Sequence, residues 1–137
     1  MRGYNVLKRE ARVLGVTGNR DILVKVLYRG KLWFEAAELQ LRRRDEDLGG
    51  LLKSKYLDQA RIVFIDEKVI KDEKDFNSLK KLDKLVIIFR EGSHEALRGG
   101  YVNIKGLCSF NNVPEALRVA REILNEVRHV IGKVHEN

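Results

Sequence analysis

The sequence predicts a single α/β domain built around a mixed β-sheet. Three short segments near the start alternate apolar and polar residues, as half-buried strands do, and two later segments are continuous apolar runs typical of strands buried on both faces. Segments with helical spacing separate these later runs. The chain has 137 residues, 44% of them hydrophobic, and no repeat or linker, so it can form the core of one domain over 1–137.

The first three strands form an expected antiparallel meander, over residues 11–16, 22–28 and 32–39. Gly18-Asn19 is a turn signal after the first strand, and Arg29-Gly30-Lys31 is a short connector after the second. In the second strand four apolar residues share one face at a period of two, and Lys25 points to the other face. Three short strands joined by tight turns predict a meander.

The rest of the sheet is expected to alternate with helices. The predicted order is helix, strand, helix, strand, glycine-bearing loop and strand, over residues 45–56, 61–66, 75–82, 85–89, 92–100 and 101–107. Gly49 and Gly50 weaken the first of these helices. Strands joined by helical crossovers run parallel, so the second half of the sheet should be parallel.

The last element is a long amphipathic helix over residues 114–131. Asn112 is its expected cap, and Gly132 is its expected end. Its apolar stripe predicts that it packs across the sheet over Phe64 and Ile87. The charged residues assigned to its outer face are Arg118, Arg121, Glu122, Glu126 and Arg128.

A three-strand meander followed by helix, strand, helix and strand is the arrangement of the ribonuclease H-like fold. In that fold, acids on the first and fourth strands hold a divalent metal. Asp66 ends the fourth predicted strand and Glu67 follows it, at the sheet edge where such folds present chemistry. The alternative is that both acids merely open a surface loop.

Four segments of the chain carry a family resemblance. They are Arg12-Val13-Leu14-Gly15-Val16, Leu27-Tyr28-Arg29-Gly30 with Trp33, Gln59-Ala60-Arg61-Ile62-Val63, and Val113-Pro114-Glu115-Ala116-Leu117-Arg118-Val119-Ala120. In this order they resemble the archaeal endonuclease dU family, which is related to endonuclease V, although the chain is shorter than its usual members. The resemblance implies a DNA-repair enzyme in which Asp66 is a catalytic acid that holds Mg²⁺ and Asp45 is the nearest candidate for a further catalytic acid.

The departures from this family concern the metal site itself. Thr17 and Gly18 stand where the family has an acid pair, Glu67 stands where a glycine follows Asp66, and Arg121 stands in place of a histidine. Mg²⁺ needs carboxylate oxygens, and two-metal cleavage needs a cluster of acids. The leading hypothesis is therefore a nucleic-acid-binding protein of endonuclease V-like ancestry that has lost metal-dependent cleavage.

Two other hypotheses stay open. In the first, Asp66, Glu67 and Asp45 hold Mg²⁺ in a rearranged site and cleave deaminated or damaged DNA. In the second, the protein is a non-catalytic interaction subunit that docks a protein partner, or a second copy of itself, through the C-terminal helix or an open sheet edge.

The charge pattern favours a polyanionic partner such as DNA or RNA. Lys and Arg outnumber Asp and Glu by 27 to 20, which gives a net charge of +7. Arg42, Arg43 and Arg44 form the densest basic run, and with Arg29 and Lys31 they are expected to line a phosphate-facing groove. The alternative is a solvated helix start that neighbouring acids neutralise.

The sequence lacks the signals that mark several other classes of protein. The single cysteine, Cys108, excludes an internal disulfide and is expected to be a small buried hydrophobe, so the chain is predicted to be cytoplasmic. No apolar stretch approaches the roughly 18 residues of a membrane span, and no signal peptide is visible. The three histidines lack zinc-site spacing. The high content of charged residues is typical of thermophile proteins.

Overall fold

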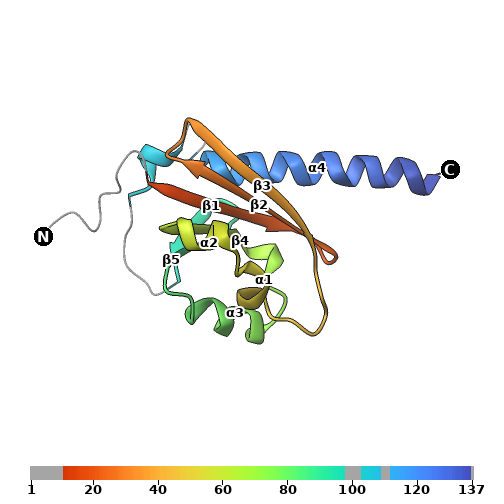
Figure 1. Cartoon of the computed structure of the whole chain (residues 1–137), viewed down its shortest axis with the longest axis horizontal. Helices are drawn as coiled ribbons and strands as arrows, with labels where there is room; N and C mark the ends of the chain where they lie inside the picture. The colour runs from red at the N-terminus through yellow and green to blue at the C-terminus, as the bar shows by residue number, and fades with distance from the viewer. Residues whose placement is uncertain (1–10, 98–102, 109–111, 137) are drawn as a thin grey trace, which may run out of the picture.

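The computed structural model describes residues 11–97, 103–108 and 112–136 and contains one six-stranded mixed sheet between two layers of helices (Figure 1). The strands are β1 (Arg12–Gly18), β2 (Ile22–Arg29), β3 (Trp33–Leu41), β4 (Ile62–Asp66), β5 (Leu85–Arg90) and β6 (Ser93–Ala96). The helices are α1 (Leu48–Leu52), α2 (Lys55–Gln59), α3 (Glu73–Lys80) and α4 (Glu115–Glu136), with 3₁₀ turns η1 (Glu67–Val69) and η2 (Lys105–Leu107).

The strand order is β3-β2-β1-β4-β5-β6. β1, β2 and β3 form the predicted antiparallel meander, β4 is parallel to β1, and β5 is parallel to β4. β6 returns antiparallel to β5 in a hairpin. The α/β class, the meander and the parallel centre are therefore confirmed.

Three predictions about individual elements are wrong. The single helix over 45–56 is two short helices, because the Ser54 hydroxyl accepts a hydrogen bond from the Leu57 N–H and starts α2 afresh. The sixth strand is β6, inside the predicted loop, where Gly92 turns the chain with a φ of 79°. Of the predicted strand over 101–107, residues 101–102 lie outside the described part, and the described remainder is mainly the 3₁₀ turn η2.

The ends of α4 also differ from the prediction. Asn112 does not cap the helix: its φ is 57°, and the helix starts at Glu115. The carbonyl of Pro114 accepts the first backbone hydrogen bonds, from Leu117 and Arg118. Gly132 does not end the helix, which continues to Glu136.

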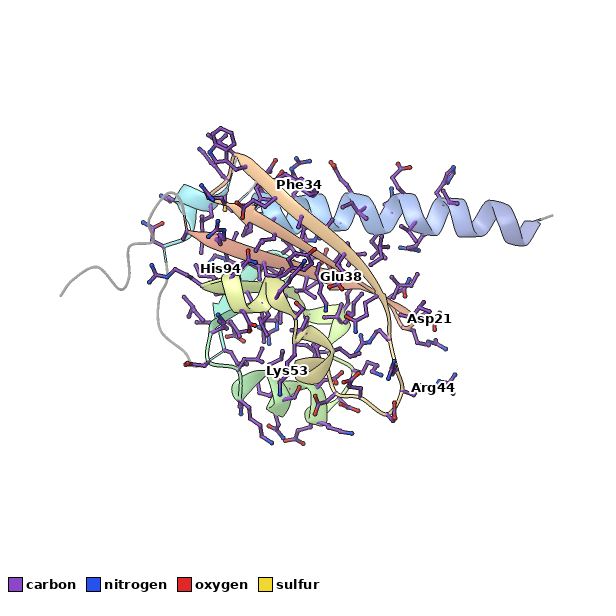
Figure 2. The ribbon with its side chains drawn as sticks, in the orientation of Figure 1. Asp21, Phe34, Glu38, Arg44, Lys53 and His94 are labelled. Carbon is purple, nitrogen blue, oxygen red and sulfur yellow. The ribbon has the colours of Figure 1, made fainter. Side chains whose placement is uncertain are left out.

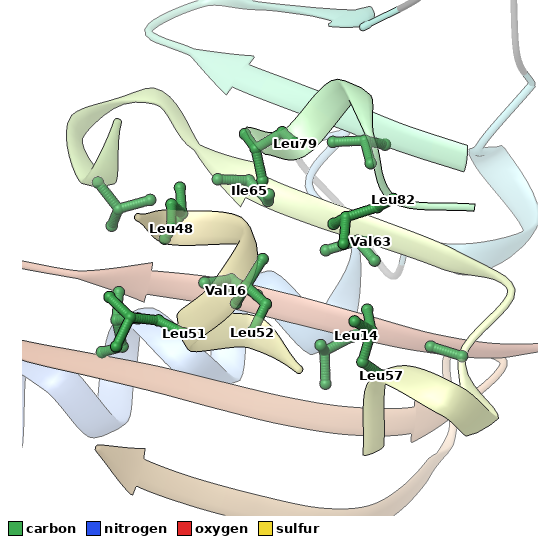
Figure 3. Packing of buried hydrophobic residues seen from close by; sticks show 14 of the residues in the cluster. Leu14, Val16, Leu48, Leu51, Leu52, Leu57, Val63, Ile65, Leu79 and Leu82 are labelled. Carbon is green, nitrogen blue, oxygen red and sulfur yellow. The ribbon is translucent and has the colours of Figure 1, made fainter. Parts of the chain in front are cut away.

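Each face of the sheet has its own hydrophobic core, which explains why the central strands are apolar on both sides. One core packs α1, α2 and α3 against the sheet through residues such as Leu14, Val63 and Leu79 (Figure 3). Lys25 enters this core at 2% exposure, and its Nζ donates to the Leu51 carbonyl at 2.7 Å. Burial lowers the pKa of Lys25.

The second core lies between the sheet and α4. Phe64 and Ile87 belong to it, as predicted, together with α4 side chains such as Leu117 and Leu124. The helix lies mainly over β1 and β2, and its last turns extend beyond the sheet (Figure 1). Val130, in that extension, is exposed.

Leu124→Ala tests whether α4 is a core helix. Leu124 is 2% exposed, so truncating it should lower the free energy of unfolding by about 2–5 kcal/mol. Glu126→Ala, at an exposed position of the same helix, is the control and should stay within roughly 0.5 kcal/mol of the parent protein. Urea denaturation of both variants measures the difference, and equal stabilities would contradict the packing.

Candidate functional site at the carboxyl edge of the sheet

Thr17 and Asp66 lie side by side at the carboxyl ends of β1 and β4. The parallel register pairs Val16 with Ile65, and Thr17 and Asp66 are the next residues along each strand. The Thr17 hydroxyl donates a hydrogen bond of 2.7 Å to Asp66 Oδ2. Both residues are buried. The expected ribonuclease H-like fold would place acids at the ends of the first and fourth strands. Those two positions, Thr17 and Asp66, do meet here, but only Asp66 is an acid.

Arg121 of α4 forms a bidentate ion pair with Asp66. Its Nε donates to Asp66 Oδ2 at 2.9 Å, and its Nη2 donates to Asp66 Oδ1. The Asp66 side chain is 7% exposed and that of Arg121 is 40% exposed, so the guanidinium closes the outer side of the carboxylate. The hydrogen bond to Asp66 raises the pKa of Arg121.

This position of Arg121 corrects its assignment to the outer face of α4. Arg121 follows Leu117 by four residues and precedes Leu124 by three, so helical spacing places it beside the buried stripe. This spacing is the sequence signal that places Arg121 near the sheet and not on the outer face of the helix. The side chain lies at the boundary of the stripe, where it reaches β4.

The residues present do not fit a magnesium site. Both oxygens of Asp66 accept hydrogen bonds from Arg121, and the guanidinium puts a positive charge where a metal ion would have to approach. Glu67 Oε2 is paired with Arg90 Nε at 2.5 Å. Asp45 is exposed on the loop after β3. Within residues 11–97, 103–108 and 112–136, no three His, Cys, Asp or Glu residues are grouped to hold a metal ion.

A pocket of about 1050 Å³ opens beside the Asp66–Arg121 pair and is called the Asp66 pocket below. It is bounded by η1, the β5–β6 hairpin, the η2 segment, the residues before α4 and Arg121 of α4. Phe89 and Ile104 contribute apolar walls, and the His94 ring (labelled in Figure 2) stacks on Phe89 with centroids 5.1 Å apart. The pocket thus combines aromatic and charged groups at the same sheet edge.

Two lysines, Lys68 and Lys105, line this pocket and are exposed. Neither has a side-chain hydrogen bond or ion pair with another residue in the described part of the chain. Arg90, in contrast, is held between Glu67 and Glu95. Among the described residues of the pocket, the two lysines are therefore the cations that are available to a ligand, and no sequence pattern marks them as site residues.

The groove predicted from the basic run is not formed. The side chain of Arg42 is buried, with Nη1 donating to the Val69 carbonyl at 2.9 Å and Nη2 lying 3.3 Å from Asp75 Oδ2, so Arg42 is a structural residue. Arg43 and Arg44 are exposed. They follow the end of β3, whereas Arg29 and Lys31 precede its start.

The two predicted halves of that groove are separated by the length of β3. Nine residues of extended chain span roughly 25–30 Å. Figure 2 labels Phe34, near the start of β3, and Arg44, in the loop beyond its end, at well separated places. Arg29 also pairs with Glu35 at 3.2 Å.

Cys108 lines the same pocket but is not a candidate nucleophile. It packs against the second core, and its Sγ donates to the Ile104 carbonyl at 3.3 Å. Burial raises its pKa to about 11, so the thiol is protonated at neutral pH. Cys108 is only partly buried, so the expectation of a small buried hydrophobe holds in part.

Comparison of the chain with models of protein families, with curated proteins and with solved structures finds no match. The resemblance to the endonuclease dU family stays a prediction. No helix in the described residues is long and apolar enough to cross a membrane.

The Arg121–Asp66 pair should stabilise the fold. Replacing Arg121 with Leu leaves a buried carboxylate without its counter-ion, which should cost about 1–3 kcal/mol in unfolding free energy. Adding Asp66→Asn should recover part of that loss, since an amide is cheaper to bury than a charge. Arg128→Leu, on the exposed side of the same helix, is the control. An Arg121→Leu variant as stable as the control would refute the role of the pair.

Proposed function

We propose that the protein binds nucleic acid at the Asp66 pocket without cleaving it, and that it derives from an endonuclease V-like ancestor with a ribonuclease H-like fold. The observation that carries the proposal is the guanidinium of Arg121 held against Asp66. It supplies positive charge at the place where an ancestral site would hold a metal ion. The guanidinium neutralises Asp66 there, but it does not activate water for hydrolysis as a metal ion does.

The strand arrangement supports this ancestry. The order β3-β2-β1-β4-β5, with an antiparallel meander followed by parallel strands, agrees with the ribonuclease H-like arrangement. In such a sheet the first and fourth strands deliver the metal-binding acids. Here the adjacent carboxyl ends of β1 and β4 carry Thr17 and Asp66, in hydrogen-bonded contact. The geometry of the site is thus compatible with the ancestral chemistry, whereas its residue types are not.

The Asp66 pocket has the two kinds of group that bind nucleic acid without regard to sequence. Lys68 and Lys105, which are exposed at the pocket, can neutralise backbone phosphates. His94, stacked on Phe89, offers an aromatic surface to a base, as stacking platforms for single strands do. The combination favours single-stranded DNA or RNA, whose bases are free to stack.

The alternative of an active Mg²⁺-dependent endonuclease is less well supported. Asp66 shares its oxygens with a hydroxyl and a guanidinium, and Glu67 is engaged by Arg90. A divalent ion would have to displace Arg121 before it could bind. Asp45 is exposed on a separate loop and has no hydrogen bond or ion pair that connects it to this group among the described residues.

The binding proposal is tested with fluorescence anisotropy on labelled single-stranded oligonucleotides at several salt concentrations. Replacing both Lys68 and Lys105 with Ala should weaken binding and should reduce the log–log salt slope by roughly 1.4, about 0.7 for each lost phosphate contact. The control is the Lys53→Ala, Lys74→Ala pair. It removes the same charge from two exposed positions in the layer of short helices, Lys53 directly after α1 and Lys74 in α3.

Two outcomes would overturn the binding proposal. One is the absence of any binding at low salt. The other is an equal effect of the two lysine pairs, because equal effects would mean that net charge acts without a defined site.

The loss of cleavage is tested by combining two substitutions. We expect no cleavage of uracil- or inosine-containing DNA by the unmodified protein with Mg²⁺ or Mn²⁺. Thr17→Asp combined with Arg121→His should create Mn²⁺ binding that calorimetry detects. The first substitution places a second carboxylate beside Asp66, and the second removes the guanidinium that competes with the metal ion. Gly18→Asp is unsuitable, since a Cβ there would lie 2.3 Å from the Ile22 carbonyl oxygen.

Cleavage by the unmodified protein that disappears in Asp66→Asn would contradict the proposal. Thermal melts of each variant establish that it is folded under the conditions of the assay. The unmodified protein, titrated with Mn²⁺ in the same calorimeter, is the reference for metal binding.

A further inference from the structure

A tryptophan and three arginines form one row across the ends of four adjacent strands, called the amino-edge row below. Trp33 at the start of β3 is paired with Arg29 at the end of β2, and Arg29 is paired with Arg12 at the start of β1. Arg61, directly before β4, extends the row, because its N–H donates to the Arg12 carbonyl at 2.9 Å. Adjacent strands are about 4.8 Å apart, so the row spans roughly 15 Å.

The amino-edge row is separate from the Asp66–Arg121 pair. Residues that are paired directly across two strands share a face of the sheet. Leu14 and Leu27, two residues along the strands from Arg12 and Arg29, belong to the core under α1, α2 and α3, so the paired residues of the row lie on that face. Thr17, five residues after Arg12 on β1, is already about 17 Å away. The row therefore lies at the opposite edge of the sheet from Asp66.

The row is accessible and carries more positive charge than the fold neutralises. The side chains of Arg12 and Arg29 are 39% and 43% exposed, and Trp33 is 63% exposed. Both guanidiniums share one carboxylate, that of Glu35, at 2.9 Å from Arg12 Nε and 3.2 Å from Arg29 Nη2. Arg61 is exposed, and its side chain forms no hydrogen bond or ion pair within the described part of the chain. Three arginines against one glutamate leave a net charge of +2.

The stability of the fold does not account for this row. Like charges in opposed positions, as in Arg12 and Arg29, destabilise a pair of strands. Asp58 and Lys84, beyond Arg61, have opposite charges and leave the excess unchanged, with Lys84 Nζ at 3.1 Å from the Asp58 carbonyl. A ligand with several negative charges and a flat ring would compensate both the excess charge and the exposed indole.

We propose that the amino-edge row is a second binding surface, which takes single-stranded nucleic acid. The exposed ring of Trp33 offers a face on which a base can stack. Arg12 and Arg29 each have five N–H donors, and Glu35 accepts only part of them, so both guanidiniums can also bind phosphate oxygens. A backbone that runs across the strands from β3 to β4 passes all three arginines. RNA-binding domains that stack bases on a sheet use the same principle.

The arrangement of the apolar side chains favours nucleic acid over a membrane surface. Leu32 and Phe34 flank Trp33 and are also exposed. Phe34 is paired with Tyr28 on the α4 face, however, and contacts the Tyr28 ring edge-on with centroids 5.9 Å apart. Trp33 and Phe34 therefore lie on opposite faces of the sheet and do not form one apolar surface for insertion into a bilayer. A base needs only the Trp33 ring.

Trp33 is the only tryptophan of the chain, so its fluorescence reports on the amino-edge row directly. A single-stranded oligonucleotide of about eight nucleotides should quench this emission at low salt in a saturable manner, and added salt should reverse the quenching. The Lys68→Ala, Lys105→Ala variant should still be quenched, because the row is separate from the Asp66 pocket. Loss of the quenching in that variant would contradict a second surface.

Replacing both Arg29 and Arg61 with Gln tests the phosphate contacts. The log–log salt slope of the quenching titration should fall by roughly 1.4, about 0.7 for each lost contact. Arg20→Gln with Arg43→Gln is the matched control, since it removes the same charge from two exposed arginines at the other ends of β2 and β3. This control should change the slope much less.

Trp33→Ala tests the stacking. In the Lys68→Ala, Lys105→Ala background, it should weaken the binding of a labelled oligonucleotide by about 5- to 100-fold in fluorescence anisotropy. Trp33→Phe should recover part of that affinity. Leu32→Ala, at an exposed neighbouring position without an aromatic ring, is the control and should bind like the background. Thermal melts establish that each variant is folded.

Three results would overturn the proposal, and none of them depends on the fate of the Asp66 pocket. Oligonucleotide binding that leaves Trp33 emission unchanged would place all contacts elsewhere and leave the pocket proposal intact. Equal salt slopes for the two arginine pairs would mean that net charge acts without a defined surface. A blue shift of Trp33 emission with vesicles of phosphatidylserine and phosphatidylcholine, without a response to oligonucleotide, would assign the surface to a membrane.

Discussion

The close contact between α4 and β1 at Gly15 is the constraint on which both the core and the site depend. A Cβ on Gly15 would lie 2.5 Å from the backbone carbon of Ala116, so only glycine lets the helix approach the sheet this closely. The contact fixes the height and position of α4 over β1. Arg121, five residues after Ala116, then lies over the end of β4 and reaches Asp66. A residue without a side chain thus positions the main ion pair of the site.

The opposite layer is stabilised in a different way, because its helices are too short to be stable alone. α1 and α2 have five residues each, and side chains satisfy the free N–H groups at the start of α1. The acceptors are Asp75 for Leu48, Ser78 for Gly49 and Asp47 for Gly50, at 2.8–2.9 Å.

Asp75 also explains why Arg42 is buried. Besides capping α1, its carboxylate accepts from the Lys71 N–H at 2.9 Å and lies 3.3 Å from Arg42. Arg42 balances the charge of a carboxylate that is 3% exposed. The densest basic run in the sequence is therefore divided between a structural residue and two exposed ones, which composition alone does not reveal.

Much of the fold follows from local patterns, whereas the site depends on tertiary contacts. The apolar runs at β4 and β5 and the alternation in β2 predict strands because burial imposes those patterns directly. β6 was missed because Ser93-His94-Glu95-Ala96 has no such pattern: it is a strand through its pairing with β5. Arg121 was placed on the wrong face because it lies at the margin of the stripe, where periodicity does not distinguish buried from exposed.

The same distinction applies to the charge at the site. The sequence shows that positions 17 and 18 carry no acid, but it does not indicate what neutralises Asp66. Asp66 is almost fully buried, and a buried carboxylate needs either a cation or protonation. A metal ion and an arginine both meet this requirement, and helix α4 supplies the arginine. The ion pair neutralises the buried carboxylate of Asp66 without any ligand. The fold itself therefore accounts for an acid at the end of β4, and that acid is not by itself evidence of a metal site.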